Sequence, residues 1–389
     1  MFFRTCLLLC LSTTGYAQAY QKLHQKALVV DTHNDVLSAV VEGANLEHNL
    51  KGKTHSDLQR FKQGGVDVQV FSVFCDERYG KGTAFAFANR EIDSLYALVQ
   101  RHPSSLMMVT TPAELKQAVR QRKMGCMIGV EGGHMIEDNL AYLDSLYKRG
   151  TRYLTLTWNN STSWATSAKD ETAGTVPNAK KGLSAFGQQV VRRMNELGMM
   201  VDVSHIGEQT FWDVMAITTK PIIASHSCVY TLCPHPRNLK DDQIKAIGKN
   251  GGVIQLNFYS GFIDSNYMKR KEAFLDRHAH ERDSLKAAGM SSYGIDEWIS
   301  KQYPQEAEAL RPQLSQLLDH IDYIVRLIGI NGVGLGSDFD GIESAPQPLD
   351  DVTSFPLITK ALLERGYSKR DVRKILGENF LRVFKANSK

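Results

Sequence analysis

The stretch "ALVVDTHND" (residues 27–35) changes character within nine residues. It begins as an aliphatic, β-branched run that is typical of a buried strand, and it ends in a cluster of polar residues. His33 and Asp35 are two positions apart, so on an extended strand both side chains point to the same face. The pair is compatible with two metal ligands or with a hydrogen-bonded pair at a strand end, and the stretch alone favours the second.

Seven further short apolar runs follow the same pattern along the chain. They are VDVQVFSVF (66–74), GCMIGVEGG (125–133), RYLTLTW (152–158), GMMVDVSH (198–205), PIIASHS (221–227), GGVIQLNF (251–258) and GVGLGSDFD (332–340). Helical patterns separate most of them, such as "TPAELKQAVRQR" (111–122), which has Pro112 at its first helical position and a capping box. Eight strands alternating with helices predict an α/β fold with a parallel sheet, and eight strands close a TIM-like (β/α)8 barrel. A doubly wound open sheet is the alternative, but no GxGxxG motif follows the first strand to support it.

The chain is longer than the roughly 250 residues of a typical barrel of this kind. The excess falls in three places: residues 75–124, a Ser/Thr/Lys/Gly-rich loop at 159–182, and a charged, helix-like insertion at 260–312. No flexible linker or internal repeat interrupts the alternation. We therefore expect a single domain with inserted loops and helices.

The composition narrows the class of protein. Of 389 residues, 42% are hydrophobic and 23% are charged, which is typical of a soluble globular protein. The net charge of +4, from 46 basic and 42 acidic residues, is too balanced to indicate a nucleic-acid partner or an anionic membrane.

The first 19 residues differ from the rest of the chain. A short basic start, an apolar run at 6–11 and small residues at 15–19 predict a secretory signal peptide. Residues 20–389 would then be the barrel domain of an exported protein, periplasmic or secreted. No later apolar run is long enough to span a bilayer, so no transmembrane segment is expected.

Polar residues stand at the ends of most of the predicted strands. They are His33, Asp35, Glu131, His205, His226, Asp338 and Asp340. In a barrel these ends meet on one rim, which is the face where the active sites of TIM barrels lie. Each residue alone has an ordinary structural interpretation, such as a turn residue or a hydrogen-bonded strand end. Their recurrence at the same end of several strands favours a shared site.

Imidazole and carboxylate groups are the usual ligands of catalytic zinc. Five such ligands are too many for one zinc that keeps an open position. A set of this size therefore predicts two metals that share a bridging carboxylate. Two metals about 3.5–4 Å apart can hold a shared water and lower its pKa. The hydroxide would attack an amide or ester carbonyl, and a remaining carboxylate would transfer the proton to the leaving group.

At this level of detail the chain resembles the renal (membrane) dipeptidase family, a branch of the metal-dependent amidohydrolases. The resemblance covers nearly the whole chain after the predicted signal peptide. It rests on DTHNDV, GVEGG, YLTLTW, VDVSH, ASHS, RNLKDD, NFY, GLGSDFDG and GENFLRVF, all in the family's order. It implies a TIM-like barrel with two zinc ions that cleaves dipeptides.

The resemblance also implies roles for particular residues. One zinc would be bound by His33 and Asp35, the second by His205 and His226, and both by Glu131 as the bridge. Asp338 matches the proton-transferring acid/base of the family. Arg237, in "PHPRNL", falls where the family has an arginine that binds the substrate carboxylate, and a guanidinium fork matches a carboxylate in geometry.

Other positions depart from the family. Mammalian members have a substrate-contacting His where this chain has Trp158. Asn159 or Asn160 could donate to the scissile carbonyl instead, or Trp158 could shape the pocket for a different side chain. Tyr259, in the NFY motif, is a further candidate substrate contact.

Two expectations concern the edges of the resemblance. Cys75 and Cys233 match cysteines that are disulfide-bonded in mammalian members, but their expected partners are absent, so we predict that both are free or differently paired. The chain ends in "FKANSK" without a hydrophobic tail, so the lipid anchor of the animal enzymes is not expected.

The favoured interpretation is a binuclear zinc dipeptidase whose small dipeptide substrates include L,D-dipeptides, because family members often accept a D-residue at the C-terminal position. The alternatives are a related amidohydrolase acting on N-acyl amino acids or lactones, and a non-catalytic barrel. Arg237 favours a substrate with a free carboxylate, and the complete set of candidate ligands argues against the non-catalytic alternative. A homodimer is a possible assembly.

Overall fold

The computed structural model describes residues 19–177, 180–290 and 292–389. The predicted signal peptide, residues 1–19, therefore lies outside the described residues except for Ala19. Within the described ranges, no helix is both long enough and apolar enough to cross a membrane.

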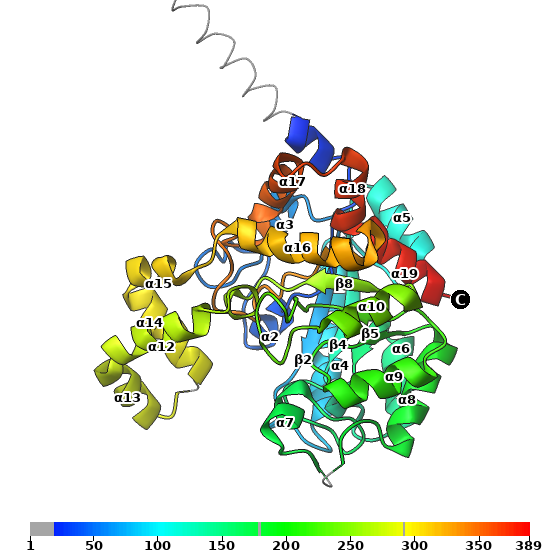
Figure 1. Ribbon diagram of the computed structural model, residues 1–389. Coiled ribbons are helices and arrows are strands. Elements are labelled where there is room, and N and C mark those ends of the chain that lie inside the picture. Colours follow the sequence, from blue (N-terminus) through cyan, green and yellow to red (C-terminus); the bar gives the residue numbers. More distant parts are fainter. Residues whose placement is uncertain (1–18, 178–179, 291) are drawn as a thin grey trace, which may run out of the picture.

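Eight parallel strands form the barrel at the centre of the molecule (Figure 1). In order of pairing they are β1 (Val30–Asp31), β2 (Val68–Phe74), β4 (Met124–Glu131), β5 (Thr151–Thr155), β6 (Met200–Asp202), β7 (Ile223–Ala224), β8 (Val253–Leu256) and β9 (Val333–Leu335). Each overlaps one of the eight apolar runs recognised in the sequence. The predicted TIM-like (β/α)8 fold is confirmed.

The barrel closes between its first and last strands. Thr32 N donates to Leu335 O at 3.2 Å. The carboxylate of Asp31 accepts from the backbone N of Ser337 at 2.8 Å and from its hydroxyl at 2.7 Å. A buried carboxylate with two donors is a stable link, so Asp31 joins two segments that are 306 residues apart in the chain.

Helices surround the strands (Figure 1). They are α2 (Val36–Val41), α3 (Leu58–Gly64), α4 (Ala84–Arg101), α5 (Pro112–Arg120), α6 (Leu140–Lys148), α7 (Ala168–Ala173), α8 (Ala185–Leu197), α9 (Glu208–Ile217), α10 (Asp241–Asn250), α16 (Leu314–Ile328), α17 (Phe355–Glu364), α18 (Lys369–Arg373) and α19 (Asn379–Asn387). The capping box predicted for α5 is present: Thr111 Oγ1 accepts from Glu114 N at 3.2 Å, and the Glu114 carboxylate accepts from Thr111 N at 2.9 Å. Helix α8 ends at Gly198, whose φ of 83° suits glycine.

Apolar residues fill the barrel away from the rim. Strand residues such as Val68 and Met200 pack with Phe380 and Phe384 of α19 in one buried cluster. The last helix thus contributes to the interior of the barrel. The histidines and carboxylates described below lie where the strands end, at the rim of the barrel.

Two elements differ from the sequence-based expectation. Within 75–124 an additional strand, β3 (Leu106–Met108), pairs with the start of β4, and its three residues are too few to show a strand pattern. The stretch "SKRDVRKILGENFLRVF" (368–384), whose sequence predicts one helix that opens with Ser368 and Asp371 as cap residues, is divided by a π-helical turn, Lys374–Glu378. A Cβ on Gly377 would lie 2.6 Å from Leu28 O, so the divided helix allows the segment before β1 to approach closely.

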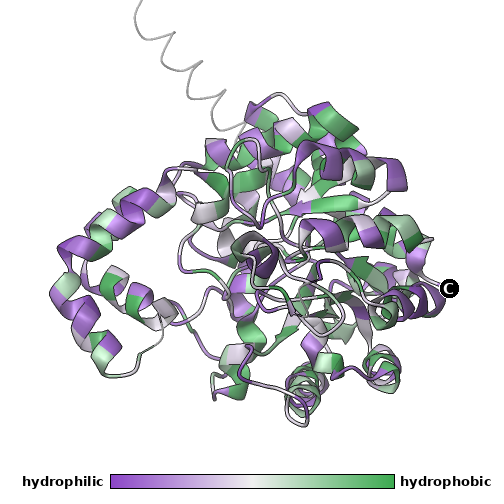
Figure 2. Ribbon diagram, turned by 60° about the horizontal axis from the view of Figure 1, so that its bottom comes forward, coloured by the Kyte–Doolittle hydropathy of each residue, from purple (hydrophilic) through white to green (hydrophobic). Residues whose placement is uncertain are grey.

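The predicted insertion begins with α11 (Ser260–Ile263), which packs on the barrel: Ile263 O accepts from His320 Nε2 at 3.0 Å. The helices that follow form an arm, residues 267–310, that stands away from the barrel (Figures 1 and 2). They are α12 (Tyr267–Arg277), α13 (Ala279–Ala287), α14 (Ser292–Gln302) and α15 (Pro304–Leu310). The arm is joined to the rim by Lys271, whose Nζ lies 2.6 Å from Asp296 Oδ2 within the arm and 2.5 Å from Glu343 Oε1 on the loop after β9.

Candidate metal centre

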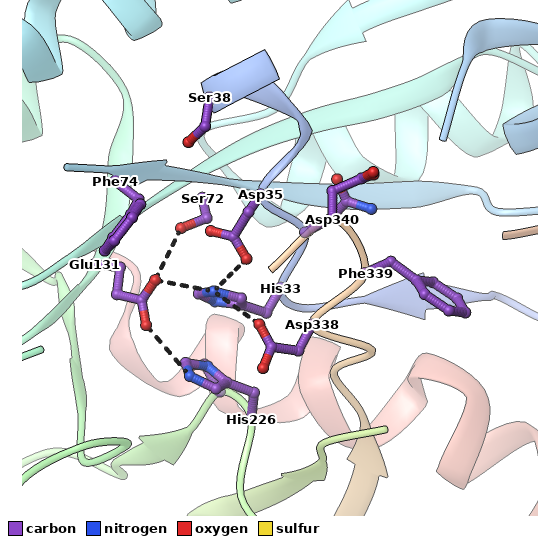
Figure 3. A network of polar contacts seen from close by, with 12 residues as sticks. His33, Asp35, Ser38, Ser72, Phe74, Glu131, His226, Asp338, Phe339 and Asp340 are labelled. Atoms are coloured by element: carbon purple, nitrogen blue, oxygen red, sulfur yellow. Dashed lines mark hydrogen bonds and ion pairs between the residues drawn. The ribbon is translucent and has the colours of Figure 1, made fainter. Parts of the chain in front are cut away.

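The structure brings all five predicted metal ligands together at the carboxyl ends of the strands. Each is buried: they are His33, Asp35, Glu131, His205 and His226. They follow or end strands β1, β4, β6 and β7. Figure 3 shows Glu131 between His33 and His226, with the carboxylates of Asp35 and Asp338 beside His33.

Glu131 lies at the centre of this group. Its Oε2 is 3.3 Å from His33 Nε2, whereas its Oε1 is 2.8 Å from His205 Nε2 and 3.4 Å from His226 Nε2. Asp35 Oδ2 is 3.4 Å from the same His33 nitrogen. The two oxygens of one carboxylate therefore face two separate pairs of side chains, and this arrangement suits two cations with Glu131 between them.

Two of the imidazoles are oriented from behind by acceptors. Ser225 Oγ donates to Asp202 Oδ2 at 2.6 Å, so it accepts the hydrogen of His226 Nδ1 at 2.8 Å. Asn159 Oδ1 lies 3.2 Å from His205 Nδ1, and an amide oxygen can only accept. In both rings Nδ1 carries the hydrogen, which leaves Nε2 with a lone pair that faces Glu131.

These residues fit a pair of metal ions. His33 Nε2 and Asp35 Oδ1 are buried without a hydrogen-bond partner among the described residues. His205 Nε2 and His226 Nε2 lie 3.0 Å apart, although neither holds a hydrogen for the other. Buried polar atoms normally have partners, and a divalent cation would satisfy several of these at once. The ligand atoms of His33, Glu131 and His226 all lie within 4.8 Å of one another.

The electrostatics of the centre favour a positive charge there. Burial acts to raise the pKa of Glu131, but His33 and His205 hold that pKa well below its usual range. Burial lowers the pKa of His205 to about 4 and that of His226 well below its usual value. Burial also acts to lower the pKa of His33, yet the groups around that ring, among them Asp35 and Glu131, raise it well above its usual value.

Asp338 lies beside the candidate ligands. Its Oδ1 is 3.9 Å from His33 Nε2, and its Oδ2 accepts from Asn257 Nδ2 at 2.7 Å. Burial raises the pKa of Asp338 well above its usual range, so the carboxyl is suited to hold a proton. The φ angles of Asp338 and His205, 62° and 66°, are in the left-handed region, and such strain is common where a site imposes the backbone conformation.

Arg237 is buried near the centre. Its guanidinium donates to His226 O at 3.2 Å and to Ser227 Oγ at 3.5 Å, while its Nε has no partner among the described residues. Burial lowers the pKa of Arg237 to about 10. Arg237 and His205 both line a cavity of about 460 Å³, so a ligand in this cavity can reach both side chains.

The other three candidate substrate contacts are placed differently from one another. The ring of Trp158 is centred 6.5 Å from that of His205, beside the candidate metal centre. The amide oxygen of Asn159 points toward His205, as described above, and so is already engaged rather than free to contact a substrate. The hydroxyl of Tyr259 donates to Glu343 Oε1 at 2.8 Å and lies 3.7 Å from Met268 Sδ, so it points to the junction between the rim and the arm.

Several residues that support the site were not recognised in the sequence. Asp202 interrupts the apolar run "GMMVDVSH", and such a charged residue inside a predicted strand is a signal that could have revealed it. Ser225 and Asn257 give no comparable signal. The four cysteines of the described residues, Cys75, Cys126, Cys228 and Cys233, are buried and free.

A TIM-like barrel with imidazoles and carboxylates at the carboxyl ends of its strands is an architecture of metal-dependent hydrolases. Comparison with known proteins identifies the family. Residues 17–389 match the membrane dipeptidase family, peptidase family M19, and the chain belongs to this family of metallo-dipeptidases. The resemblance inferred from the motifs is confirmed.

The sequence of one relative agrees with this assignment, and two solved structures share the fold. A dipeptidase of Schizosaccharomyces pombe, described as uncharacterized, is 33% identical over 386 residues, which cover 95% of this chain and 82% of that protein. The probable dipeptidase PvdM from Pseudomonas aeruginosa is 25% identical with a TM-score of 0.79, over 96% of this chain and 98% of PvdM. A metallopeptidase from Rhodobacter sphaeroides, solved with a phosphinate mimic of L-Ala-D-Ala, is 23% identical with a TM-score of 0.74, over 93% and 99% of the two chains.

Proposed function

We propose that this protein is a binuclear zinc dipeptidase. One zinc is bound by His33 and Asp35, the other by His205 and His226, and Glu131 bridges the two. The observation that carries the proposal is the position of Glu131, whose Oε2 faces His33 and whose Oε1 faces His205 and His226. Zinc is favoured over harder cations because three of the five ligands are imidazoles.

The metal pair, when bound, lowers the pKa of a shared water and polarises the substrate carbonyl. The proton chemistry then falls to Asp338. As the water adds to the carbonyl carbon, Asp338 accepts its proton at Oδ1, the oxygen that faces His33. As the carbon–nitrogen bond breaks, Asp338 returns this proton to the leaving amine. Asn257 holds the other oxygen throughout.

Substrate position depends on the cavity beside the metal centre. Arg237 binds the carboxylate of the C-terminal residue, because its Nε has no other partner among the described residues and its charge is buried. The width of the site at the scissile bond is set by Trp158, which contacts Phe74 with ring centroids 4.9 Å apart. Asn159 acts on His205 rather than on the substrate.

The substrates are L,L- and L,D-dipeptides. L-Ala-D-Ala is the first compound to test, because the Rhodobacter sphaeroides protein of the same fold holds a mimic of it. N-acetyl-alanine is the informative comparison: it has an amide and a free carboxylate but no free amine.

The test is a metal analysis followed by a hydrolysis assay. We expect about two zinc ions per chain, cleavage of dipeptides, and loss of cleavage when a chelator removes the metal. A protein that takes up no zinc and leaves every dipeptide intact would contradict the proposal. Hydrolysis of N-acetyl-alanine at the rate of L-Ala-D-Ala would instead favour the N-acyl amino acid alternative.

A further inference from the structure

The side chain of Tyr153 extends into the barrel next to a glycine. Tyr153 lies on β5 in register with Gly129 on β4, and both are buried. A Cβ on Gly129 would lie 2.0 Å from Tyr153 Cζ, too close for any side chain at that position. The glycine therefore provides the space that the aromatic ring occupies, and the two residues form a matched pair.

The hydroxyl of Tyr153 contacts two groups of β1 and its C-terminal extension. It donates its single hydrogen to Thr32 O at 3.0 Å. Its oxygen also lies 2.8 Å from His33 Nδ1. A phenol has one hydrogen, so toward His33 the oxygen can only accept, and His33 Nδ1 must carry a hydrogen. The lone pair available for a metal is then on Nε2, the nitrogen that faces Asp35 and Glu131.

We propose that Tyr153 is a positioning residue that fixes the tautomer and ring plane of His33, and that it thereby sets the metal affinity of one half of the centre only. This inference rests on the proposed binuclear site. The half affected is the one formed by His33 and Asp35, since Tyr153 is hydrogen-bonded to neither His205 nor His226.

The other half has its own supporting group. His226 is oriented by Ser225, which is in turn held by Asp202. Supporting partners of metal-bound histidines typically contribute 10–100-fold in affinity. Two separate supports, each on one histidine, predict that the two zinc ions can be weakened independently.

Three single variants and one double variant test this in the zinc-loaded full-length chain. Tyr153→Phe retains the ring and removes the hydroxyl, and Ser225→Ala removes the support of His226. Tyr96→Phe is the matched control, because the Tyr96 hydroxyl donates at 3.0 Å to Arg149 O, outside the candidate centre. Zinc retained per chain is measured against increasing chelator concentration.

We expect wild type and Tyr96→Phe to behave alike. Tyr153→Phe and Ser225→Ala should each lose one zinc at 10–100-fold lower chelator concentration and keep the second at nearly the wild-type affinity. The double variant should lose both at the low concentration. Tyr153→Phe with wild-type retention of both ions overturns the inference, and so does a double variant that still holds one ion tightly, because both residues would then act on the same zinc.

A second measurement does not require a variant to fold. In ¹H–¹⁵N spectra of the zinc-loaded wild type, His33 should show its hydrogen on Nδ1, slow to exchange because the ring is buried. A hydrogen on Nε2 contradicts the inference. Failure of the proposed function looks different: wild type with two tightly bound zinc ions that cleaves no dipeptide would refute the dipeptidase activity and leave the role of Tyr153 intact.

Discussion

The rim of the barrel and the arm are built in contrasting ways. At the rim, side chains such as Glu131 and His226 are buried and contacted from several strands. In the arm, α13 and α15 have no buried residues, and the local apolar core consists of Phe274, Ile295 and Ile299. A site that must hold atoms within a few tenths of an ångström requires buried side chains that are contacted from several strands, as at the rim.

The surface of the arm also contrasts with the buried rim, because large hydrophobic side chains are exposed on it. Among the described residues, the large hydrophobic side chains with the greatest exposure are Met268 at 46%, Met290 at 38% and Trp298 at 37%, and all three lie in the arm. Figure 2 shows hydrophilic and hydrophobic residues mixed along its helices. Lys271 provides one of the polar contacts between the arm and the rim, through Glu343.

The largest effect is expected for a change of Glu131, which lies at the centre of the candidate ligands. Glu131→Gln keeps the shape of the side chain but removes the negative charge between the two histidine groups. We expect both zinc ions to be lost. Dipeptide hydrolysis should fall by more than about 100-fold, because residues that only support a ligand already contribute 10–100-fold in metal affinity or activity. Metal analysis and kcat/KM measure this. Glu137→Gln is the control, because the Glu137 carboxylate accepts from the backbone N of Gly82 and of Phe85 at the start of α4; this variant should retain both ions.

Asp338→Asn separates binding from chemistry at the same rim. The amide cannot accept and return a proton, so turnover should fall by about 10²–10⁴-fold while both zinc ions remain. The measurement is kcat together with metal content. Loss of zinc from this variant would mean that Asp338 is a ligand rather than the acid/base.

Lys271→Met tests the connection between the two regions. It leaves the half-buried carboxylates of Asp296 and Glu343 without their shared cation, and hydrogen bonds to charged groups typically contribute about 1.5–3 kcal/mol. We expect faster proteolysis within the arm, with a smaller change in the thermal unfolding of the barrel. Lys301→Met removes an exposed pair with Glu297 and should change stability by no more than about 0.5 kcal/mol. Equal proteolysis of the two variants would contradict the anchoring role of Lys271.

The smallest predicted effect concerns pH and a site remote from the metals. Burial raises the pKa of Asp67 to about 6, against about 3.9 in an unfolded chain, and its carboxylate accepts from Val29 N. The folded state therefore binds a proton more tightly, so this contribution to stability is complete below about pH 4 and is lost as the pH rises through 6. Asp67→Asn should remove that loss, worth on the order of 2 kcal/mol at pH 7. Thermal unfolding between pH 4 and 7 measures it, and an unchanged pH dependence would contradict the prediction.

Much of the barrel could be predicted from the sequence because buried parallel strands require apolar runs, and eight such runs are visible. The strand β3 could not be predicted, because a three-residue strand has no period to recognise. The division of the last helix at Gly377 was also missed, since its cause is contact with Leu28, nearly 350 residues earlier.

The location of the candidate site could also be predicted from the sequence. His33, Glu131 and His226 stand out because polar residues at strand ends converge in a barrel. The orientation of those side chains could not be derived in the same way. Tyr153 contacts His33 across 120 residues, and that contact depends on the absence of a side chain at Gly129. Patterns of residue type reveal where polar groups gather, and the structure reveals which of them are held in place.

The closure between β1 and β9 has a consequence for the order in which the molecule is made. A ribosome synthesises His33 near the start of the chain, but the strand that pairs beside it is not complete until residue 335. All five candidate ligands fall within the first 226 residues, whereas Asp338, the proposed acid/base, follows the last strand of the barrel. A loop of about 300 residues must close before Asp338 can lie beside His33. A nascent chain therefore contains every proposed metal ligand before it contains the residue proposed to transfer the proton.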